Sequence, residues 1–292
     1  MHAVRLGCHI LEFTEMSIDR RGLVLGAVAF GGASVPSVKA AGPNIPELYK
    51  KLRYRADDGV LFWWLDGTKF GQVGAEVTPL FGMKVGTIAR VRNQADATFT
   101  VTSLEIVFYT ELKSGALLKQ WTNPYTGAVM PVAHAPLGPT AIRHGVDGMP
   151  IRNTVLGGNR ITARSDIHPL AIVGDDVWLA HDSTASVERD GGKSPPFLVN
   201  DWSTYLGKLA DLQDAAKPVG AATVYLQEAT GWSKWMGMDG KPGNQVARAV
   251  GRKVLSYAEM PADWRALMAE INPAIAADPI AALDKPEARF DR

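Results

Sequence analysis

Apolar and polar residues alternate in short stretches along most of the chain from residue 60 onward. Alternation with a period of two is typical of β-strands that bury one face. Turn residues such as Asp66-Gly67 and Ser114-Gly115 separate the stretches, roughly every 8 to 12 positions, as in antiparallel sandwiches and barrels. We expect strands at residues 60–65, 69–73, 78–81, 86–92, 98–112, 116–121, 128–133, 160–165, 171–173, 176–181 and 223–229.

Three further segments are predicted to be helical, at residues 45–54, 201–215 and 260–271. Pro46 can open the first helix, and Asn200 or Asp201 can cap the second. The strands and helices do not alternate in the way that a parallel sheet requires. The chain is therefore predicted to be mainly β, an antiparallel lipocalin-like barrel or sandwich with peripheral helices.

The first forty residues have the three parts of a secretory signal. Arg20 and Arg21 stand directly before an uncharged apolar stretch at residues 23–35, which is shorter than the about 20 residues of a transmembrane helix. Residues 38–41 then supply the small side chains that a signal peptidase recognises. We expect residues 1–40 to be an upstream extension and a twin-arginine signal peptide, and the exported part to be periplasmic. The alternative is a first helix of the folded protein, which the glycines of this segment disfavour.

Charge and cysteine content narrow the range of functions. The 292 residues include 31 Lys and Arg against 30 Asp and Glu, without the basic excess of a nucleic-acid-binding protein. No later apolar run is long enough for a stable membrane anchor. The single cysteine, Cys8, lies in the expected signal segment. We therefore expect residues 41–292 to form a single β-rich domain without thiol or disulfide chemistry.

Several separated motifs occur in order along residues 45–270. They are Phe62-Trp63-Trp64, Trp121 with Asn123-Pro124-Tyr125, Val199-Asn200-Asp201 with Tyr205, Trp232 with Trp235, and Gly251-Arg252-Lys253. Together they resemble the motifs of an uncharacterised bacterial family, domain of unknown function 1838. The family name implies no reaction, but its members often carry a twin-arginine signal, which agrees with the N-terminal segment. The resemblance and the strand pattern together suggest a lipocalin-like barrel.

Glu105 is the most informative candidate for catalysis. It shares one face of its predicted strand with Val101, Ser103, Val107 and Tyr109, so its neighbours are mostly apolar. If this face lines the interior of a barrel, desolvation would raise the pKa of the Glu105 carboxyl and suit it to general acid–base catalysis.

Arg90 could pair with Glu105 or bind an oxygen of the ligand, and Tyr109 could stabilise developing charge. The alternative for Glu105 is a purely structural ion pair with Arg90 or Arg92. Among the histidines, His134 and His181 are the better candidates for proton transfer, because each stands at the end of a predicted strand. No pair of histidines has metal-binding spacing, and we expect no metal site.

Aromatic side chains suggest a binding site for a flat or apolar ligand. We expect Trp64, Trp121, Trp232 and Trp235 to contact it, although the last two could instead form an aromatic plug at one barrel end. Asp201 and Tyr205 are four residues apart and would share one face of the predicted helix at the rim of the site. The alternative is that Asp201 only caps the helix and Tyr205 only packs against its neighbours.

No phosphate-binding loop, dinucleotide-binding glycine motif or Gly-x-Ser-x-Gly motif occurs, so we expect no cofactor. Two functions remain open. The first is a cofactor-independent periplasmic enzyme of lyase or isomerase type, which transfers a proton on an aromatic or apolar small molecule. The second is a non-catalytic protein that binds an apolar ligand in a β-barrel. A carboxylate and an arginine inside the barrel would favour the enzyme.

Overall fold

A computed structural model describes residues 43–134, 136–151, 154–156, 159–188, 192, 196–285 and 289–290. The expected signal peptide and Cys8 lie outside the described residues. From Pro43 onward the chain forms one compact unit. None of the helices within this described part is long and apolar enough to cross a membrane.

Eleven strands pair into one antiparallel sheet, and β4 and β5 form a separate hairpin. The order in the sheet is β13-β7-β8-β9-β10-β11-β12-β1-β2-β3-β6. The elements are α1 (Ile45–Arg53), β1 (Gly59–Val73), β2 (Glu76–Asn93), β3 (Phe99–Thr110), β4 (Gln120–Thr122), β5 (Val129–Pro131), β6 (Leu137–His144), β7 (Thr154–Leu156), β8 (Asn159–Val173), β9 (Asp176–Val187), β10 (Phe197–Lys208), α2 (Leu209–Gln213), β11 (Thr223–Thr230), η2 (Lys234–Met236), β12 (Asn244–Val254), η3 (Tyr257–Glu259), α3 (Ala262–Ile271), α4 (Pro273–Ala277), η4 (Ala281–Leu283) and β13 (Arg289–Phe290).

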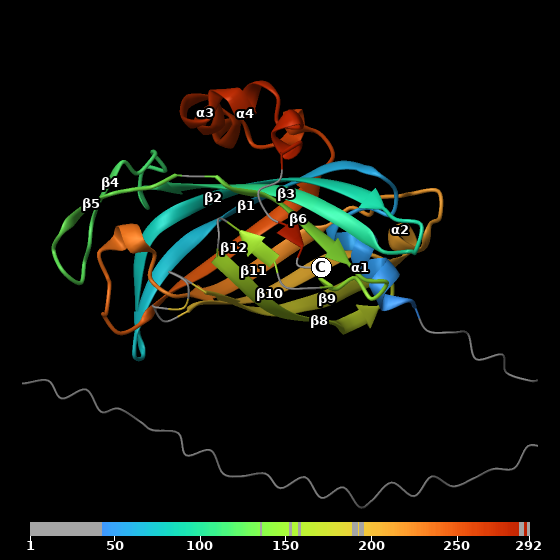
Figure 1. Ribbon diagram of the computed structural model, residues 1–292, viewed down its shortest axis with the longest axis horizontal. Helices are drawn as coiled ribbons and strands as arrows, with labels where there is room; N and C mark the ends of the chain where they lie inside the picture. Colours follow the sequence, from blue (N-terminus) through green and yellow to red (C-terminus); the bar gives the residue numbers. More distant parts are fainter. Residues whose placement is uncertain are drawn as a thin grey trace, which may run out of the picture. The chain divides into compact units, whose positions relative to one another are not determined.

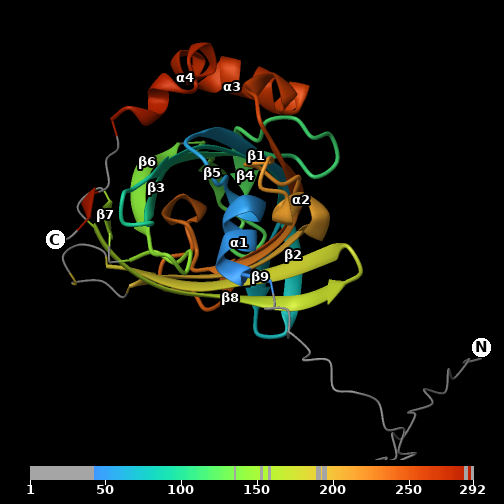
Figure 2. The same cartoon turned by 90° about the vertical axis from the view of Figure 1, so that its right-hand side faces the viewer.

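The nine strands from β8 to β6 curl strongly into a half-barrel, as Figures 1 and 2 show. The right-handed twist of neighbouring strands accumulates over a sheet of this width and bends it. No second large sheet faces it within the described residues, so the barrel alternative describes this fold better than the sandwich. The prediction of a mainly β, antiparallel fold with a few helices is confirmed.

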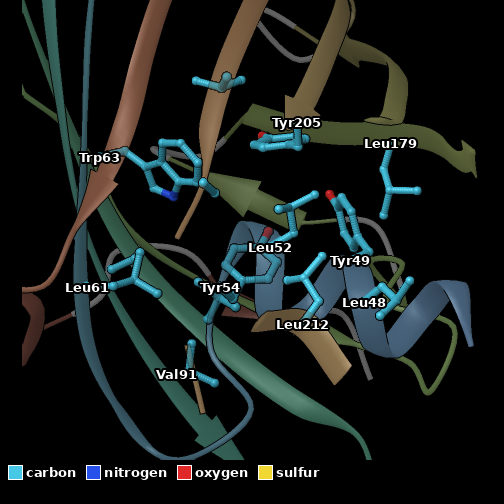
Figure 3. Close-up of a cluster of buried hydrophobic side chains, with 14 of the residues drawn as sticks. Leu48, Tyr49, Leu52, Tyr54, Leu61, Trp63, Val91, Leu179, Tyr205 and Leu212 are labelled. Atoms are coloured by element: carbon cyan, nitrogen blue, oxygen red, sulfur yellow. The ribbon is translucent and has the colours of Figure 1, made fainter. Parts of the chain in front are cut away.

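Helix α1 lies on the concave side of the sheet (Figure 2). Its buried residues Leu48, Tyr49 and Leu52 pack against inward side chains of several strands, including Trp63 and Tyr205 (Figure 3). Burial of this apolar helix face removes a large area from water and holds α1 in place. The helix thereby fills one end of the half-barrel.

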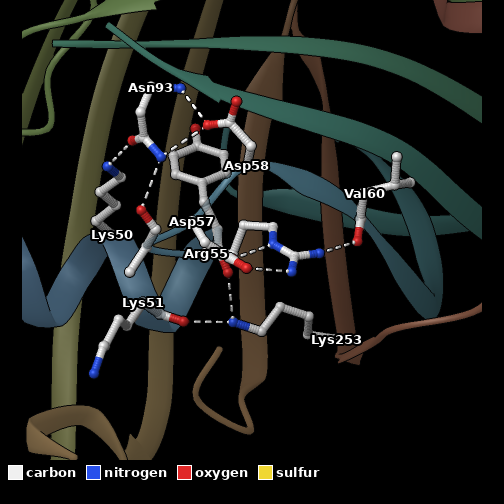
Figure 4. Close-up of polar contacts among 10 residues, drawn as sticks. Lys50, Lys51, Arg55, Asp57, Asp58, Val60, Asn93 and Lys253 are labelled. Carbon is white, nitrogen blue, oxygen red and sulfur yellow. Dashed lines mark hydrogen bonds and ion pairs between the residues drawn. The ribbon is translucent and has the colours of Figure 1, made fainter. Parts of the chain in front are cut away.

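A buried lysine secures the C-terminal end of α1 (Figure 4). The Nζ of Lys253, on β12, donates hydrogen bonds to the carbonyl oxygens of Lys51, Leu52 and Tyr54 at 2.6, 2.7 and 3.0 Å. These carbonyls have no partner within the helix, because the last turn always leaves its acceptors free. An ammonium group at a helix C-terminus is also favoured by the helix dipole. Burial, and the nearby Arg55, lower the pKa of Lys253 to about 7.

The opposite end of the half-barrel carries an aromatic plug, built by β4, β5 and η2 (Figure 1). Phe81 of β2 lies at its centre, with its ring 5.6 Å from both Trp121 and Trp235. Met236 and Met238 are buried beside these rings, where flexible thioethers fill the remaining gaps.

Helices α3 and α4 cover part of the convex face (Figure 2). Trp264 and Met268 of α3 pack against the outward residues Ile88 and Leu104. Gly86 allows this approach, because a Cβ atom there would lie 2.1 Å from the Trp264 ring. The predicted helix at 260–271 is thus confirmed as α3, and the predicted helix at 45–54 is confirmed as α1.

Two local predictions are wrong. Asp66-Gly67 does not form a hairpin, because β1 runs without interruption from Gly59 to Val73. Gly67 instead lets β1 approach β12 closely, since a Cβ atom there would lie 2.3 Å from the Arg248 carbonyl oxygen. The predicted helix at 201–215 is mostly β10, and only Leu209–Gln213 is helical. Its Trp, Thr and Tyr residues favour a strand, and pairing with β9 and β11 stabilises this strand.

Candidate functional site

The strand register decides which side chains face the interior. Trp63 on β1 lies opposite Thr87 on β2, and Thr87 lies opposite Glu105 on β3. Directly opposed residues of antiparallel strands share one face of the sheet. Since Trp63 packs against α1 on the concave side, Glu105 faces the interior as well. The predicted inward face of this strand therefore agrees with the structure.

Glu105 is exposed to solvent and at the same time surrounded by the curled sheet. Water reaches the carboxyl group from the open side, while protein atoms replace most of its outer hydration. This partial desolvation, together with the negative charge of Glu228, raises the pKa of Glu105 to about 7. Lys69 and Arg53 oppose the shift. A carboxyl group with this pKa can both accept and donate a proton near neutral pH.

Lys69 and Glu228 form an ion pair across the interior, with 2.7 Å between Nζ and Oε1. The side chain of Lys69 is 9% exposed and that of Glu228 25% exposed. Ala247 of β12 lies between them in the register, and its short side chain lets the two longer ones meet above it. Burial lowers the pKa of Lys69, but the charges of Glu228 and other groups raise it above its usual value overall, so Lys69 stays charged.

Asp201 adds another carboxyl group to the same surface. It lies on β10 directly opposite Glu228 on β11. Burial raises the pKa of Asp201 to about 6, against the hydrogen bond that Ser203 Oγ donates to its Oδ1 at 2.6 Å. Three carboxyl groups from three strands therefore influence one another on the concave surface.

Arg53 supplies a second cation from the last residue of α1. Its Nη1 donates to the hydroxyl of Tyr49 at 2.5 Å and to Nδ1 of His181 at 2.9 Å. The guanidinium carbon also lies 5.8, 5.2 and 5.7 Å from the ring centres of Tyr49, Tyr54 and Tyr205, which is within cation–π range. Aromatic groups on several elements thus fix the position of this arginine.

His181 lies in the interior beside Arg53, as an acceptor rather than a proton carrier. Burial and the positive charge of Arg53 lower the pKa of His181 to about 2. The imidazole is therefore neutral over the whole physiological range and accepts the Arg53 hydrogen bond. This environment argues against the predicted role of His181 in proton transfer.

Tyr205 and Tyr109 both face the interior, at different ends. Tyr205 packs edge-on against Trp63 at 5.6 Å, and burial raises the pKa of its hydroxyl to about 12. Tyr109 lies next to the aromatic plug, 4.9 Å from the Phe81 ring, and burial raises its pKa as well. Both hydroxyl groups stay protonated and can donate hydrogen bonds.

The predicted partnership of Arg90 with Glu105 is wrong. Arg90 points to the convex face, where its Nη1 lies 2.7 Å from Oδ1 of Asp284 and its Nη2 donates to the Ile280 carbonyl oxygen. Even- and odd-numbered residues of β2 lie on opposite faces, and Arg90 has the parity of Ile88 rather than of Thr87. Arg53 is the arginine that shares the interior with Glu105.

Trp64 is also on the convex face, packed in the layer beneath α3. The inward tryptophan is its neighbour Trp63, whose Nε1 donates to the Arg53 carbonyl oxygen at 2.9 Å. A shift of one position exchanges the two faces of a strand, so the sequence alone could not decide between the two residues. The predicted contact of Trp64 with an interior ligand is therefore corrected.

His134, Trp121, Trp232 and Trp235 belong to the plugged end. His134 accepts a hydrogen bond at Nδ1 from the Tyr109 backbone at 3.3 Å, and its Nε2 lies 3.0 Å from the Leu118 carbonyl oxygen. With both ring nitrogens occupied by backbone groups, His134 holds two segments together. The ring centres of Trp121 and Trp235 are 5.8 Å apart in the plug. This agrees with the alternative that the tryptophans form an aromatic plug at one barrel end.

Asp201 and Tyr205 do share one face, but on a strand instead of a helix. Four residues correspond to two full strand periods, so both side chains point inward from β10. Residues of the interior that the sequence reasoning missed are Arg53, Lys69 and Glu228. The alternation in residues 223–229 places Glu228 on one face with Val224 and Leu226, which is the signal that could have identified it.

Among the described residues no three His, Cys, Asp or Glu side chains are grouped in a way that could hold a metal ion. The interior instead combines carboxyl groups of raised pKa with two cations and several phenolic hydroxyls. This set can transfer a proton and stabilise a negative charge that develops next to it.

Comparisons with known proteins give a family match over part of the chain. No curated protein and no solved structure matches this chain. Residues 58–169 match the family model described as protein of unknown function, DUF1838. The matched range includes β1, β2 and β3 and therefore Lys69 and Glu105. Over residues 58–169 this chain is similar to the DUF1838 family.

Proposed function

We propose that this protein is a cofactor-independent enzyme of lyase or isomerase type, which transfers a proton on an aromatic or apolar small molecule. The observation that carries the proposal is Glu105, an interior carboxyl group that water can reach and whose pKa is about 7. A structural carboxylate would be paired directly with a cation, and Glu105 has no ion pair within the described residues.

Groups around Glu105 supply the remaining requirements of such a reaction. The Lys69 ammonium and the protonated Tyr109 hydroxyl both influence the Glu105 carboxyl and can stabilise an oxyanion on the substrate. Asp201, whose pKa is about 6, is a second candidate for proton transfer. A pair of titratable groups with different pKa values is typical of sites that need both an acid and a base.

The inner wall next to Glu105 suits an apolar substrate. Met83, Val85 and Ala247 form a buried cluster there, with Leu65 and Val107 packed against it. Apolar surface with a few polar groups that converge on one place is the usual composition of a small-molecule site.

A binding protein that does not transform its ligand is the second candidate. The apolar cluster around Met83 is the observation that favours it. Charged groups held together on the interior surface at a cost in desolvation favour catalysis instead, because a carrier of apolar ligands does not need them.

Hydrogen exchange tests the proposal through the proton-transfer step itself. The full-length protein is incubated in D₂O with a panel of aromatic and apolar compounds, and deuterium uptake or conversion is followed by mass spectrometry. We expect the wild type to catalyse exchange or conversion of one compound class, and Glu105→Gln to reduce the rate at least about 100-fold. Glu76→Gln, at an exposed strand end, is the matched control. Equal rates for Glu105→Gln and the wild type would refute the assignment.

We also propose that the folded domain acts in the periplasm. The proposal rests on the twin arginines and the apolar segment that follows them.

A further inference from the structure

Arg53 uses only part of its hydrogen-bonding capacity within the protein. A guanidinium group has five N–H donors. Nη1 serves Tyr49 and His181, while Nε and Nη2 have no acceptor in the part of the chain that the structure describes. Several buried side-chain nitrogen and oxygen atoms of the described residues lack a hydrogen-bond partner. Nε and Nη2 of Arg53 are not among these buried atoms, so both are accessible. The Nε–Nη2 edge is therefore free for an acceptor from outside.

No carboxylate of the described residues lies within ion-pair distance of Arg53. Arg53 interacts electrostatically with Asp201 and Glu105, where it opposes the rise of the pKa that burial causes. Asp201 is engaged by Ser203. A partly buried cation inside a protein usually has an anionic partner, because desolvation of an unpaired charge is costly.

The guanidinium is held rigidly before any ligand arrives. Its backbone belongs to the last turn of α1, which Lys253 caps, and Trp63 binds the Arg53 carbonyl oxygen. Tyr49, Tyr54 and Tyr205 surround the charged group. A preorganised arginine loses little side-chain entropy when it binds a ligand, and its planar edge matches the two oxygens of a carboxylate.

We infer that the Nε–Nη2 edge of Arg53 binds a carboxylate of the substrate, and that the substrate is an aromatic or apolar monocarboxylate. This inference rests on the proposed function and specifies its substrate class. Charge balance favours a single negative charge, because Arg53 and Lys69 already face Glu228, Asp201 and Glu105 on the same surface. A dianion such as a phosphate monoester would add too much negative charge.

Aromatic rings lie near the Arg53 guanidinium. The Tyr205 ring centre is 5.7 Å from the guanidinium carbon, and Trp63 packs edge-on against Tyr205 with ring centres 5.6 Å apart. Figure 3 shows these two rings. A substrate ring can rest against them while its carboxylate contacts Arg53. The positive charge of Arg53 also acts on the Glu105 carboxyl, which faces the same concave surface.

Matched pairs of acids and amides test the inference by binding alone. Isothermal titration calorimetry compares benzoate, 3-phenylpropanoate, cinnamate and 2-naphthoate with the corresponding neutral amides. We expect the wild type to prefer at least one acid over its amide by at least about tenfold, as for a charge-assisted hydrogen bond. Arg53→Met should remove this preference, and Arg53→Lys should retain part of it.

Arg248→Met is the matched control, because Arg248 also contacts a tyrosine, Tyr225, but on the convex face. It should leave the preference unchanged. Equal affinity for acids and amides across the panel, including no binding of either, overturns the inference, and so does an unchanged preference in Arg53→Met. Circular dichroism shows whether each variant is folded. If Arg53→Met does not fold, the preference of Arg53→Lys for acids over amides decides whether Arg53 binds the carboxylate.

Glu105→Gln separates this inference from the proposed function. The variant should keep the preference for acids, because Glu105 does not contact the carboxylate in this arrangement. A protein that prefers acids through Arg53 but catalyses no exchange refutes the enzyme only. A protein that catalyses exchange without this preference refutes the carboxylate site only.

Discussion

Lys69 reaches across β12 to Glu228, with 2.7 Å between its Nζ and Oε1 of the glutamate, and Ala247 is the residue that makes room between them. The ion pair connects β1 with β11, two strands that do not pair with each other directly. It also places a permanent positive charge close enough to lower the pKa of Glu105.

Replacement of Lys69 by Met should change both stability and the Glu105 carboxyl. Loss of one member of a buried pair costs about 3–5 kcal/mol, and the partial exposure of Glu228 reduces the expected loss to about 1–3 kcal/mol. Without the nearby cation the pKa of Glu105 should rise further above 7. Urea unfolding and the pH profile of exchange measure these effects. The double variant Lys69→Met with Glu228→Gln should recover most of the stability, and no recovery would contradict an ion pair.

The stability that Glu105 and Asp201 contribute should fall as pH rises between about 4.5 and 7. Glu105 and Asp201 have pKa values of about 7 and 6 in the folded protein, above the usual 4.5 and 3.8 of free side chains. These two carboxyl groups therefore bind more protons in the folded state, so their stabilisation is complete below the unfolded pKa values and is lost as pH passes the folded ones. Buried His181, with a folded pKa of about 2 against the usual 6.5, contributes the opposite slope, so the carboxyl groups are tested by comparing variants with the wild type. Urea unfolding from pH 4 to 8 measures the slope.

Glu105→Gln and Asp201→Asn should each make the slope of the unfolding free energy against pH more positive than in the wild type, and Glu76→Gln should leave it unchanged. Solvent access to Glu105 screens its contribution, so we expect a smaller effect from Glu105→Gln than the pKa shift alone implies. Slopes of Glu105→Gln and Asp201→Asn equal to the wild-type slope would contradict the raised pKa values of both groups.

Lys253→Met should loosen the C-terminal end of α1. Three carbonyl oxygens lose the ammonium donor, although that of Lys51 keeps the Gly220 N–H at 3.3 Å, and we expect a loss of about 1–3 kcal/mol in the free energy of unfolding. Arg53 follows in the chain directly after Leu52, so the preference for acids over amides should weaken as well. Lys217→Met, at an exposed ion pair, is the control and should change neither quantity. Unchanged stability of Lys253→Met would show that the cap is dispensable.

Export should depend on the paired arginines. Replacement of Arg20 and Arg21 by lysine keeps the charge but removes the recognition motif. In a bacterial host, fractionation and immunoblotting should find the wild type in the periplasm and the double variant in the cytoplasm. Arg5→Lys serves as the control. Equal periplasmic amounts of all three proteins would contradict twin-arginine export.

Part of the interior could be predicted from the sequence, because parity shows which residues of one strand share a face. The alternation puts Glu105 on the same face as Val101, Val107 and Tyr109, and the structure places all four inward. The face of a regular strand follows from parity alone, because successive side chains point in opposite directions. Trp63 and Trp64 show the limit, since both are apolar and either could have faced the core.

Asp201 shows a different limit. Asn200 and Asp201 are residue types that are typical of a helix N-cap, yet residues 197–208 form a strand. The Trp, Thr and Tyr residues of this segment favour a strand, and pairing with β9 and β11 on both sides outweighed the capping pattern. The pairing partners themselves lie far away along the chain, so the local sequence does not identify them.

The sequence by itself determined the mainly β class, the helices at both ends of the domain and the set of residues that share a strand face with Glu105, because periodicity and turn residues act over a few positions. Only the tertiary structure decided which charges meet. Arg53, Lys69, Glu228 and Asp201 come from a helix and three strands far apart along the chain. The curl of the sheet and the insertion of α1 bring them to one surface, and the raised pKa values of Asp201 and Glu105 arise from that shared enclosure.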